Sequence, residues 1–268
     1  MLNLKFGEST HPGKLRTSNE DRMSVFEPPS DEESRSVGWM FAVADGVRGA
    51  GLGDLAAQAA VEVMRRQFPA LAASRPLVEA LPELVRIANS AVRNEASTIG
   101  RMRDHMATTI IVCALRADEA VVAHVGDSRL YQIRQGSVIF VTDDHTLVNE
   151  QRKLGLISQA EQNQSEMRHV LSRSLGPLPL VEVDTTTLPL RAGDVLVLCT
   201  DGIHKAMYDD EIARISTFDH DAQTIADEIV RLAVDVDGSD NSTVQVVQIE
   251  SVEMIGMHRG RKYRVVTA

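Results

Sequence analysis

Three apolar runs in this sequence each end in an aspartate that a small residue follows. The three endings are Asp45-Gly46, Asp127-Ser128 and Asp201-Gly202. Apolar runs of this length are typical of buried strands, and a buried strand that ends in an acid carries a carboxylate to the edge of its sheet. The pattern therefore predicts a pocket in which acids from distant parts of the sequence meet.

A fourth acid, Asp240, comes shortly before the alternating run 244–249, which is typical of a strand. Carboxylates that lie close together repel one another unless a divalent cation compensates their charge. Ligand sets made only of oxygen favour Mg²⁺ or Mn²⁺ over Zn²⁺. A single Asp-Gly pair is more often a turn, but turns between exposed strands have no reason to follow a run as apolar as 195–199. Together, the four acids indicate a metal site.

Composition and charge narrow the class of protein. The chain has 268 residues, of which 43% are hydrophobic, so it can bury a large core as one domain or as two small ones. The formal net charge of -10 argues against nucleic acid and against an anionic membrane as partners. Cys113 and Cys199 lie in apolar segments, which predicts buried thiols in a reducing compartment. Residues 1–10 have no apolar signal-peptide core, so we expect a cytoplasmic protein.

The order of the apolar patterns predicts an antiparallel α+β fold. Helices are expected at 54–68, at 83–96 with Pro82 in the first turn, and at 221–234. Strands joined mostly as hairpins, with helices that come in pairs, favour antiparallel layers over a parallel sheet. The expected strands are 23–26, 39–44, 108–115, 120–125, 130–133, 138–142, 181–188, 195–199 and 244–249.

Two segments depart from this pattern. The stretch 146–167 is polar and weakly periodic, with a capping box that starts at Ser158 and reaches Glu161, and we expect it to form a mobile flap. Residues 251–268 carry several basic side chains after a run of acids. They are expected to form either a basic tail or a terminal strand.

Eight ordered blocks between residues 10 and 249 resemble the metal-dependent protein phosphatases, the type 2C serine/threonine phosphatases, in their compact bacterial form. Each block alone is a weak signal, whereas eight blocks in the family's order are a strong one. The blocks are Arg16-Thr17-Ser18-Asn19-Glu20-Asp21, Val43-Ala44-Asp45-Gly46, Thr108-Thr109, Val125-Gly126-Asp127-Ser128-Arg129, Asp144-His145-Thr146-Leu147-Val148, Ser172-Arg173-Ser174-Leu175-Gly176, Thr200-Asp201-Gly202 and Asp240-Asn241-Ser242-Thr243.

The resemblance implies an α+β fold, a four-layer α-β-β-α sandwich in which two antiparallel β-sheets are flanked by helices. Residues 1–250 would form a single catalytic domain, with the flap near 146–170. The resemblance also implies a centre that holds two Mn²⁺ or Mg²⁺ ions. Asp45 would bridge the two ions, the Gly46 carbonyl would bind one, Asp201 and Asp240 would hold the other, and Glu20 and Asp21 would orient bound waters.

The activity implied by the resemblance is hydrolysis of phosphoserine and phosphothreonine in proteins. A hydroxide that bridges the two ions would attack phosphorus in line, and Arg16 would bind the phosphoryl group through two of its oxygens. Phosphorylated proteins would be the partners, including a cognate serine/threonine kinase or its substrates in a bacterial signalling pathway. We expect the enzyme to act as a monomer.

Three positions depart from the family's pattern. Relatives often have a histidine at the place of Ala50, proposed there as the general acid, and Arg48 is bulkier than the usual glycine. Relatives also have an aspartate at the place of Lys205, where it helps to hold a third ion together with the residue equivalent to Asp127. A lysine would repel that ion, so a third metal site is doubtful. His145 follows two acids, but we assign it a structural role before the flap.

Two other functions remain open from the sequence. The glycines between 46 and 53 imitate a loop that binds a nucleotide, although Asp54 stands where the last glycine of that fingerprint should be. Alternatively, the chain is a catalytically weak or inactive family member that acts as a phosphoprotein-binding regulator. The missing histidine at Ala50 and the presence of Lys205 are the features that favour this second reading.

Overall fold

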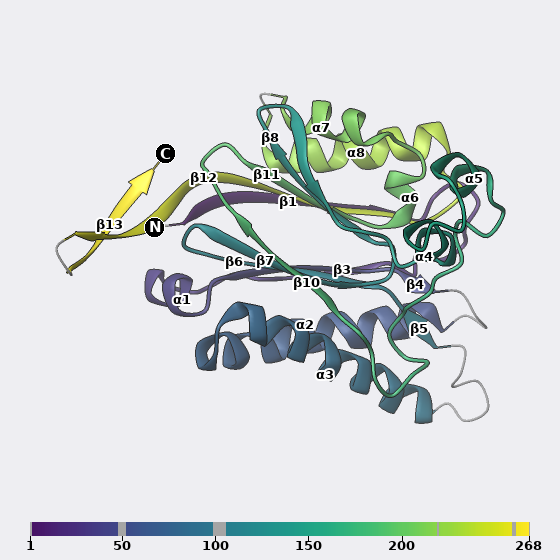
Figure 1. Ribbon diagram of the computed structural model, residues 1–268, viewed down its shortest axis with the longest axis horizontal. Coiled ribbons are helices and arrows are strands. Elements are labelled where there is room, and N and C mark those ends of the chain that lie inside the picture. Colours follow the sequence, from purple (N-terminus) through teal and green to yellow (C-terminus); the bar gives the residue numbers. More distant parts are fainter. Residues whose placement is uncertain (1, 48–51, 99–105, 219, 259–260, 268) are drawn as a thin grey trace.

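Two antiparallel sheets lie face to face between two layers of helices, in a computed structural model that describes residues 2–47, 52–98, 106–218, 220–258 and 261–267 (Figure 1). The first sheet has the strand order β1-β12-β11-β8-β9, and β13 pairs with β12 beyond this path. The second sheet has the order β10-β7-β6-β3-β2. The predicted four-layer α-β-β-α sandwich is confirmed.

Each strand of the first sheet runs antiparallel to its neighbours. The strands are β1 (Asn3–His11), β8 (Arg129–Arg134), β9 (Ser137–Val141), β11 (Val195–Cys199), β12 (Ser242–His258) and β13 (Arg261–Thr267). The helices α6 (Asp201–His204), α7 (Asp209–Ser216) and α8 (Ala222–Val236) follow on its outer side.

The second sheet is antiparallel throughout as well. Its strands are β2 (Arg22–Phe26), β3 (Trp39–Ala44), β6 (Ile110–Arg116), β7 (Glu119–Val125) and β10 (Asp184–Pro189). The long helices α2 (Gly53–Ser74) and α3 (Leu77–Thr98) cover its outer face, as Figure 1 shows. Shorter elements are α1 (Asp31–Ser36), the paired strands β4 (Gly46–Val47) and β5 (Ala107–Thr108), and the flap helices α4 (Leu147–Lys153) and α5 (Gln159–Gln164).

Strand β3 contributes to two of the three hydrophobic cores. Met40 and Ala42 point to the helices α2 and α3, whereas Phe41 and Val43 point between the two sheets. Side chains alternate across a strand, so a central strand that is covered on both faces must be apolar at every position. This is why 39–44 reads as a continuous apolar run.

Several predicted elements differ in their bounds. Strand β1 was not predicted, because its alternation of polar and apolar residues is weak. Helix α3 starts at Leu77, and Pro82 lies in its interior, so the placement of Pro82 in the first turn is wrong. The capping box at Ser158 is confirmed at the start of α5. The helix expected at 221–234 is α8, which begins at Ala222 with Asp221 as its N-cap.

The region after residue 250 continues as strand. β12 runs on to His258 and pairs with β13 in a hairpin that projects from the body of the fold (Figure 1). Within the described parts of the chain, no helix is both long and apolar enough to cross a membrane.

Candidate metal centre

Both sheets deliver acids to the same end of the sandwich. Asp45 follows β3 and Asp127 follows β7, both in the second sheet, while Asp201 follows β11 in the first. Because β12 runs antiparallel to β11, its start lies at this end too, which places Asp240 nearby. The strand ends therefore gather the acids that the sequence predicted to meet.

Three of these acids form a compact group, which we call the acidic cluster. Asp45, Asp127 and Asp201 each offer a carboxylate oxygen, and these oxygens lie within 4.8 Å of one another. Asp127 and Asp201 are buried. Oxygen atoms at this spacing can share one cation, and all-oxygen sites suit Mg²⁺ or Mn²⁺.

Electrostatic repulsion inside the group is visible in the pKa values of the acids. Burial, followed by repulsion from Asp201, Asp21, Asp127 and Asp240, raises the pKa of Asp45 well above its usual range. Burial and the charge of Asp201 raise the pKa of Asp127 to about 7. Acids that resist ionisation in this way are stabilised by a cation.

Glu20 and Asp21 lie at the margin of the acidic cluster, just before β2. Both side chains are buried, and Glu20 Oε2 and Asp21 Oδ1 have no hydrogen-bond partner among the described residues. Burial, with Asp201 and Asp240 nearby, raises the pKa of Asp21 to about 7. Buried carboxylate oxygens without partners are costly, so these two acids fit a site that holds ions and their waters.

Two residues to which the sequence analysis gave no role hold this acidic pair in place. Thr200 Oγ1 donates a hydrogen bond of 2.9 Å to Asp21 Oδ2. Asn241 Oδ1 accepts one of 2.9 Å from the Glu20 amide, while its Nδ2 donates to the carbonyl oxygens of Pro12 and Ser18. None of these contacts leaves a local sequence pattern, since the partners are up to 229 residues apart.

The backbone around two glycines is packed too closely for a side chain. A Cβ atom on Gly202 would lie 1.9 Å from the Asn241 carbonyl oxygen, so the residue after Asp201 must be glycine for α6 to meet the start of β12. A Cβ on Gly46 would lie 2.8 Å from the Glu20 carbonyl oxygen. The Asp45 carbonyl accepts hydrogen bonds from the Thr109 amide and the Thr108 hydroxyl, which fixes the turn into Gly46.

Arg16 lies beside the acids and not in open solvent. Its Nη2 donates to Asp240 Oδ2 at 3.1 Å, and about a third of each side chain is exposed, 34% and 29%. A pocket of about 530 Å³, the metal-site pocket, brings Arg16 to the same hollow as Asp45, Asp201 and Asp240. A cationic fork next to an acidic ion site is the arrangement that binds a phosphoryl group.

Lys205 enters the acidic cluster from α6. Its Nζ donates to Asp201 Oδ2, one helical turn earlier. The loop at Arg48 and Ala50 lies outside the described residues.

His145 and His204 lie beside the acidic cluster, and among the described residues no histidine belongs to it. His145 Nδ1 accepts a hydrogen bond from the Gly126 amide at 3.1 Å, which helps to hold the turn that carries Asp127 and supports a structural role. The histidines have no regular spacing in the sequence, yet the ligand atoms of His124, His145 and Asp184 lie within 4.8 Å of one another, as a metal site would require. Because His145 Nδ1 is an acceptor, Nε2 carries the proton and is a poor metal ligand. His204 bonds the Asp127 carbonyl oxygen at 2.9 Å, and His105 lies outside the described residues.

A family model described as Protein phosphatase 2C matches residues 19–235. The chain belongs to this family.

Relatives of this protein phosphatase 2C chain carry matching names. The serine/threonine phosphatase stp of Listeria monocytogenes serovar 1/2a is 29% identical over 242 residues, which cover 89% of this chain and 93% of the relative. The Mycobacterium tuberculosis serine/threonine phosphatase PstP/Ppp has a similar crystal structure, with a TM-score of 0.81, 27% identity, and coverage of 93% of this chain and 100% of that chain. A structure of the PstP catalytic domain with two manganese ions has a TM-score of 0.76 and 28% identity, with coverage of 93% and 100%.

Proposed function

We propose that this protein phosphatase 2C enzyme hydrolyses phosphoserine and phosphothreonine esters in proteins and depends on Mn²⁺ or Mg²⁺. The observation that carries the proposal is the acidic cluster, with buried and unpaired oxygens of Glu20 and Asp21 beside it and Arg16 in the same pocket. Membership in the family supports the reaction class.

The residues of the chain divide the work by their chemistry. Asp45, Asp201, Asp240 and the Gly46 carbonyl would hold two ions, and Glu20 and Asp21 would accept hydrogen bonds from waters on them. Arg16 would turn from Asp240 toward the phosphate and offset the charge that develops on its oxygens. Bound ions supply activation of the attacking water near neutral pH. The products are inorganic phosphate and the free hydroxyl of serine or threonine.

The proposal extends to the setting in which the enzyme works. We infer that it acts as a cytoplasmic monomer on phosphoproteins, among them a cognate serine/threonine kinase or its substrates. The two cysteines, Cys113 and Cys199, are free and buried, which supports a reducing compartment.

One observation favours a second candidate, a weak or inactive member that binds phosphoproteins without hydrolysing them. The hydrogen bond from Lys205 to Asp201 places a positive charge where an ion ligand is needed. A chain of this kind would bind a phosphopeptide and release it unchanged.

Hydrolysis assays separate the two candidates. Purified protein is given an aryl phosphate and peptides with phosphoserine, phosphothreonine or phosphotyrosine, in Mn²⁺, in Mg²⁺ and in chelator. We expect release of phosphate from the aryl ester and from the first two peptides, only with metal. Asp201→Asn is the matched inactive control. Phosphopeptide binding without phosphate release in Mn²⁺ would support the regulator and contradict the enzyme.

A further inference from the structure

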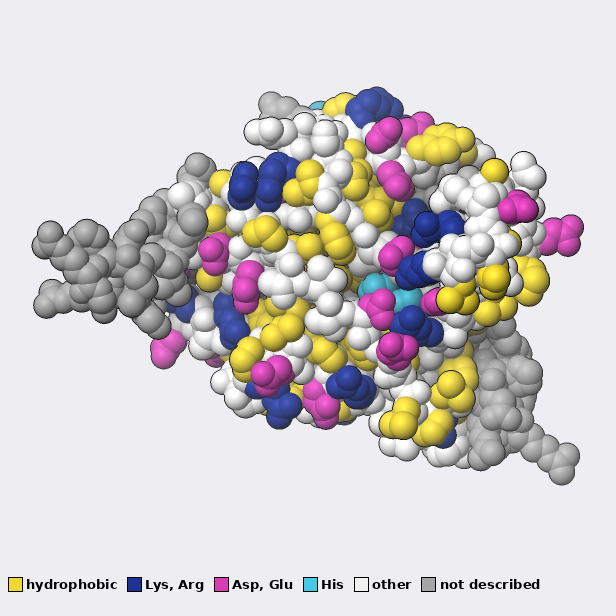
Figure 2. All heavy atoms as spheres, in the orientation of Figure 1, with side chains coloured by type: hydrophobic (Ala, Val, Ile, Leu, Met, Phe, Trp, Pro, Cys, Tyr) yellow, Lys and Arg dark blue, Asp and Glu magenta, His cyan; other side chains and the backbone are white. Residues whose placement is uncertain are grey.

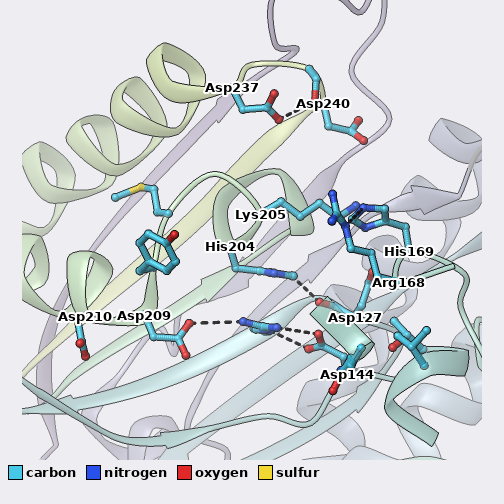
Figure 3. A pocket seen from close by; sticks show the side chains of 17 residues that line it. Asp127, Asp144, Arg168, His169, His204, Lys205, Asp209, Asp210, Asp237 and Asp240 are labelled. Atoms are coloured by element: carbon cyan, nitrogen blue, oxygen red, sulfur yellow. Dashed lines mark hydrogen bonds and ion pairs between the residues drawn. The ribbon is translucent and has the colours of Figure 1, made fainter. Parts of the chain in front are cut away.

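A second hollow, the side groove, opens from the metal-site pocket. Its volume is about 1100 Å³, and Asp127, His169, Lys205 and Asp240 line both hollows. Figure 3 shows how the groove leads from Lys205, Arg168 and His169 toward Asp209 and Asp210. A phosphorylated residue in the metal-site pocket would therefore place its neighbours along the chain in the side groove.

The two walls of the side groove differ in charge. Arg168 and His169 come from the flap. Figure 2 shows hydrophobic side chains grouped over the flap, and Leu154 and Leu156 of this segment are exposed. The opposite wall carries Asp209 and Asp210 from the start of α7, together with Asp237 from the end of α8. This wall is acidic.

The arginine on the floor of the groove does not neutralise that wall. Arg129 Nε and Nη2 each donate to the carboxylate of Asp144 at 2.8 Å, and Nη1 donates to Asp209 at 3.4 Å. Because the two bonds to Asp144 are the shorter ones, the guanidinium mainly neutralises the charge of Asp144. Asp210 and Asp237 still give the outer wall a negative charge.

An exposed aromatic ring accompanies these acids. Tyr208 directly precedes Asp209 and lines the side groove, and 81% of its surface is exposed. Acids in the first turn of α7 also stabilise that helix, which would account for Asp209 and Asp210 without a ligand. That explanation does not account for the exposed ring or for Asp237, which comes from the end of α8 and accepts a hydrogen bond from the Ser239 hydroxyl.

We propose that the side groove binds the polypeptide next to the phosphorylated residue and that its acidic wall selects an arginine in that segment. The proposal rests on the phosphatase function proposed above. A guanidinium can stack on the Tyr208 ring while it donates to the carboxylate of Asp210 in the first turn of the same helix, and Asp237 adds negative charge to the groove. A lysine fits less well because its ammonium group is compact and has no plane to stack.

Phosphopeptides that differ in one residue test the proposal. One phosphothreonine peptide is made with alanine at every flanking position, and variants carry a single arginine at one of the positions two to four residues before or after the phosphothreonine. For at least one placement we expect a kcat/KM about fivefold above the alanine peptide, the scale of an exposed ion pair with a cation–π contact. The gain should shrink in 0.5 M salt.

Variants of the acidic wall locate the effect. Asp210→Asn and Tyr208→Ala should each remove most of the gain in kcat/KM that arginine gives. Asp210→Lys should reverse the preference, so that a peptide with glutamate at the same position is hydrolysed faster than the arginine peptide. Glu32→Gln is the matched control, because Glu32 is an exposed acid in the first turn of α1, at the other end of the fold. That variant should keep the full arginine preference.

The outcomes separate the two proposals. If the unmodified enzyme hydrolyses the aryl phosphate and the alanine peptide but prefers no arginine placement, the side-groove proposal is overturned and the phosphatase function stands. An arginine preference that survives Asp210→Lys would also overturn it. Failure of all hydrolysis with Mn²⁺ would overturn the phosphatase function first.

Discussion

Lys205 donates a hydrogen bond to the carboxylate of Asp201 inside the acidic cluster. Burial disfavours the ammonium charge, but Asp201, Asp127 and Asp45 outweigh it and raise the pKa of Lys205. The lysine therefore supplies part of the positive charge that these acids require. The number of ions that the site binds depends on where this charge lies.

We predict that the unmodified enzyme binds two Mn²⁺ ions tightly and that Lys205→Asp binds a third at millimolar Mn²⁺. At ~4 Å a lysine charge opposes a divalent ion, and replacing it with a carboxylate ligand shifts the ion's binding free energy by several kcal/mol at an effective dielectric constant near 20. Isothermal titration counts the ions, and metal-soaked crystals locate them. Lys205→Met, which loses only the charge, is the control. A well-occupied third ion beside Asp127 in the unmodified protein would contradict the prediction.

Loss of either Asp45 or Asp201 should abolish phosphate release. In metal-free protein, Asp45→Asn should also raise the melting temperature, because a neutral amide replaces a buried acid whose ionisation is opposed by burial and by its acidic neighbours. The gain should be smaller for Asp201→Asn, since this change also takes away the partner of Lys205. Calorimetry with chelator and an aryl phosphate assay with saturating Mn²⁺ measure the two effects. Substantial activity in either variant would remove these residues from the site.

Arg16→Ala should weaken action on substrate and leave metal binding intact. A lost charge-assisted contact to phosphate lowers kcat/KM by roughly 10- to 1,000-fold, while the Mn²⁺ concentration for half-maximal activity stays the same. Steady-state kinetics across a Mn²⁺ series give both quantities. Arg65→Ala, at an exposed position on α2, is the control. A parallel loss of metal affinity would instead assign Arg16 a structural role through Asp240.

The metal-free protein should lose stability as pH rises from about 4 to 8. The pKa values of Asp21 and Asp127 are raised to about 7 in the folded protein, against about 3.9 for an unfolded chain. The folded state thus holds more protons between these values, so the free energy of unfolding falls with rising pH. Mn²⁺ should abolish most of this slope. Melting temperatures over this range, with chelator and with Mn²⁺, check the sign, and a slope unaffected by Mn²⁺ would contradict it.

Much of the sandwich could be predicted because central strands must be apolar at every position. The runs at 39–44 and 195–199 became β3 and β11 with the same bounds. The expected strands 130–133 and 138–142 form the β8-β9 hairpin, and its turn lies at Gln135-Gly136, where both residues adopt positive φ. Strand β1 was not predicted, because its polar and apolar residues do not alternate clearly. Its place in the sheet is set by its pairing with β12.

The acids of the site could be predicted from their position after apolar runs, but their supports could not. Asn241 and Thr200 hold Glu20 and Asp21 across more than 170 residues of chain, and a buried amide carries no spacing signal. The approach of His145 to Gly126 was equally hidden. Contacts of this kind arise from packing of whole sheets, which no local pattern encodes.

The acids come from two different sheets. Asp201 and Asp240 belong to the first sheet, while Asp21, Asp45 and Asp127 belong to the second, and the layer between them is filled by aliphatic and aromatic side chains such as Phe41 and Leu196. Those side chains act as a spacer that sets how far apart the two halves of the ion site stand. A substitution that changes the volume of these side chains would change the distance between the ligands of the two sheets without touching any ligand. The hydrophobic interior would therefore contribute to which ion the enzyme prefers.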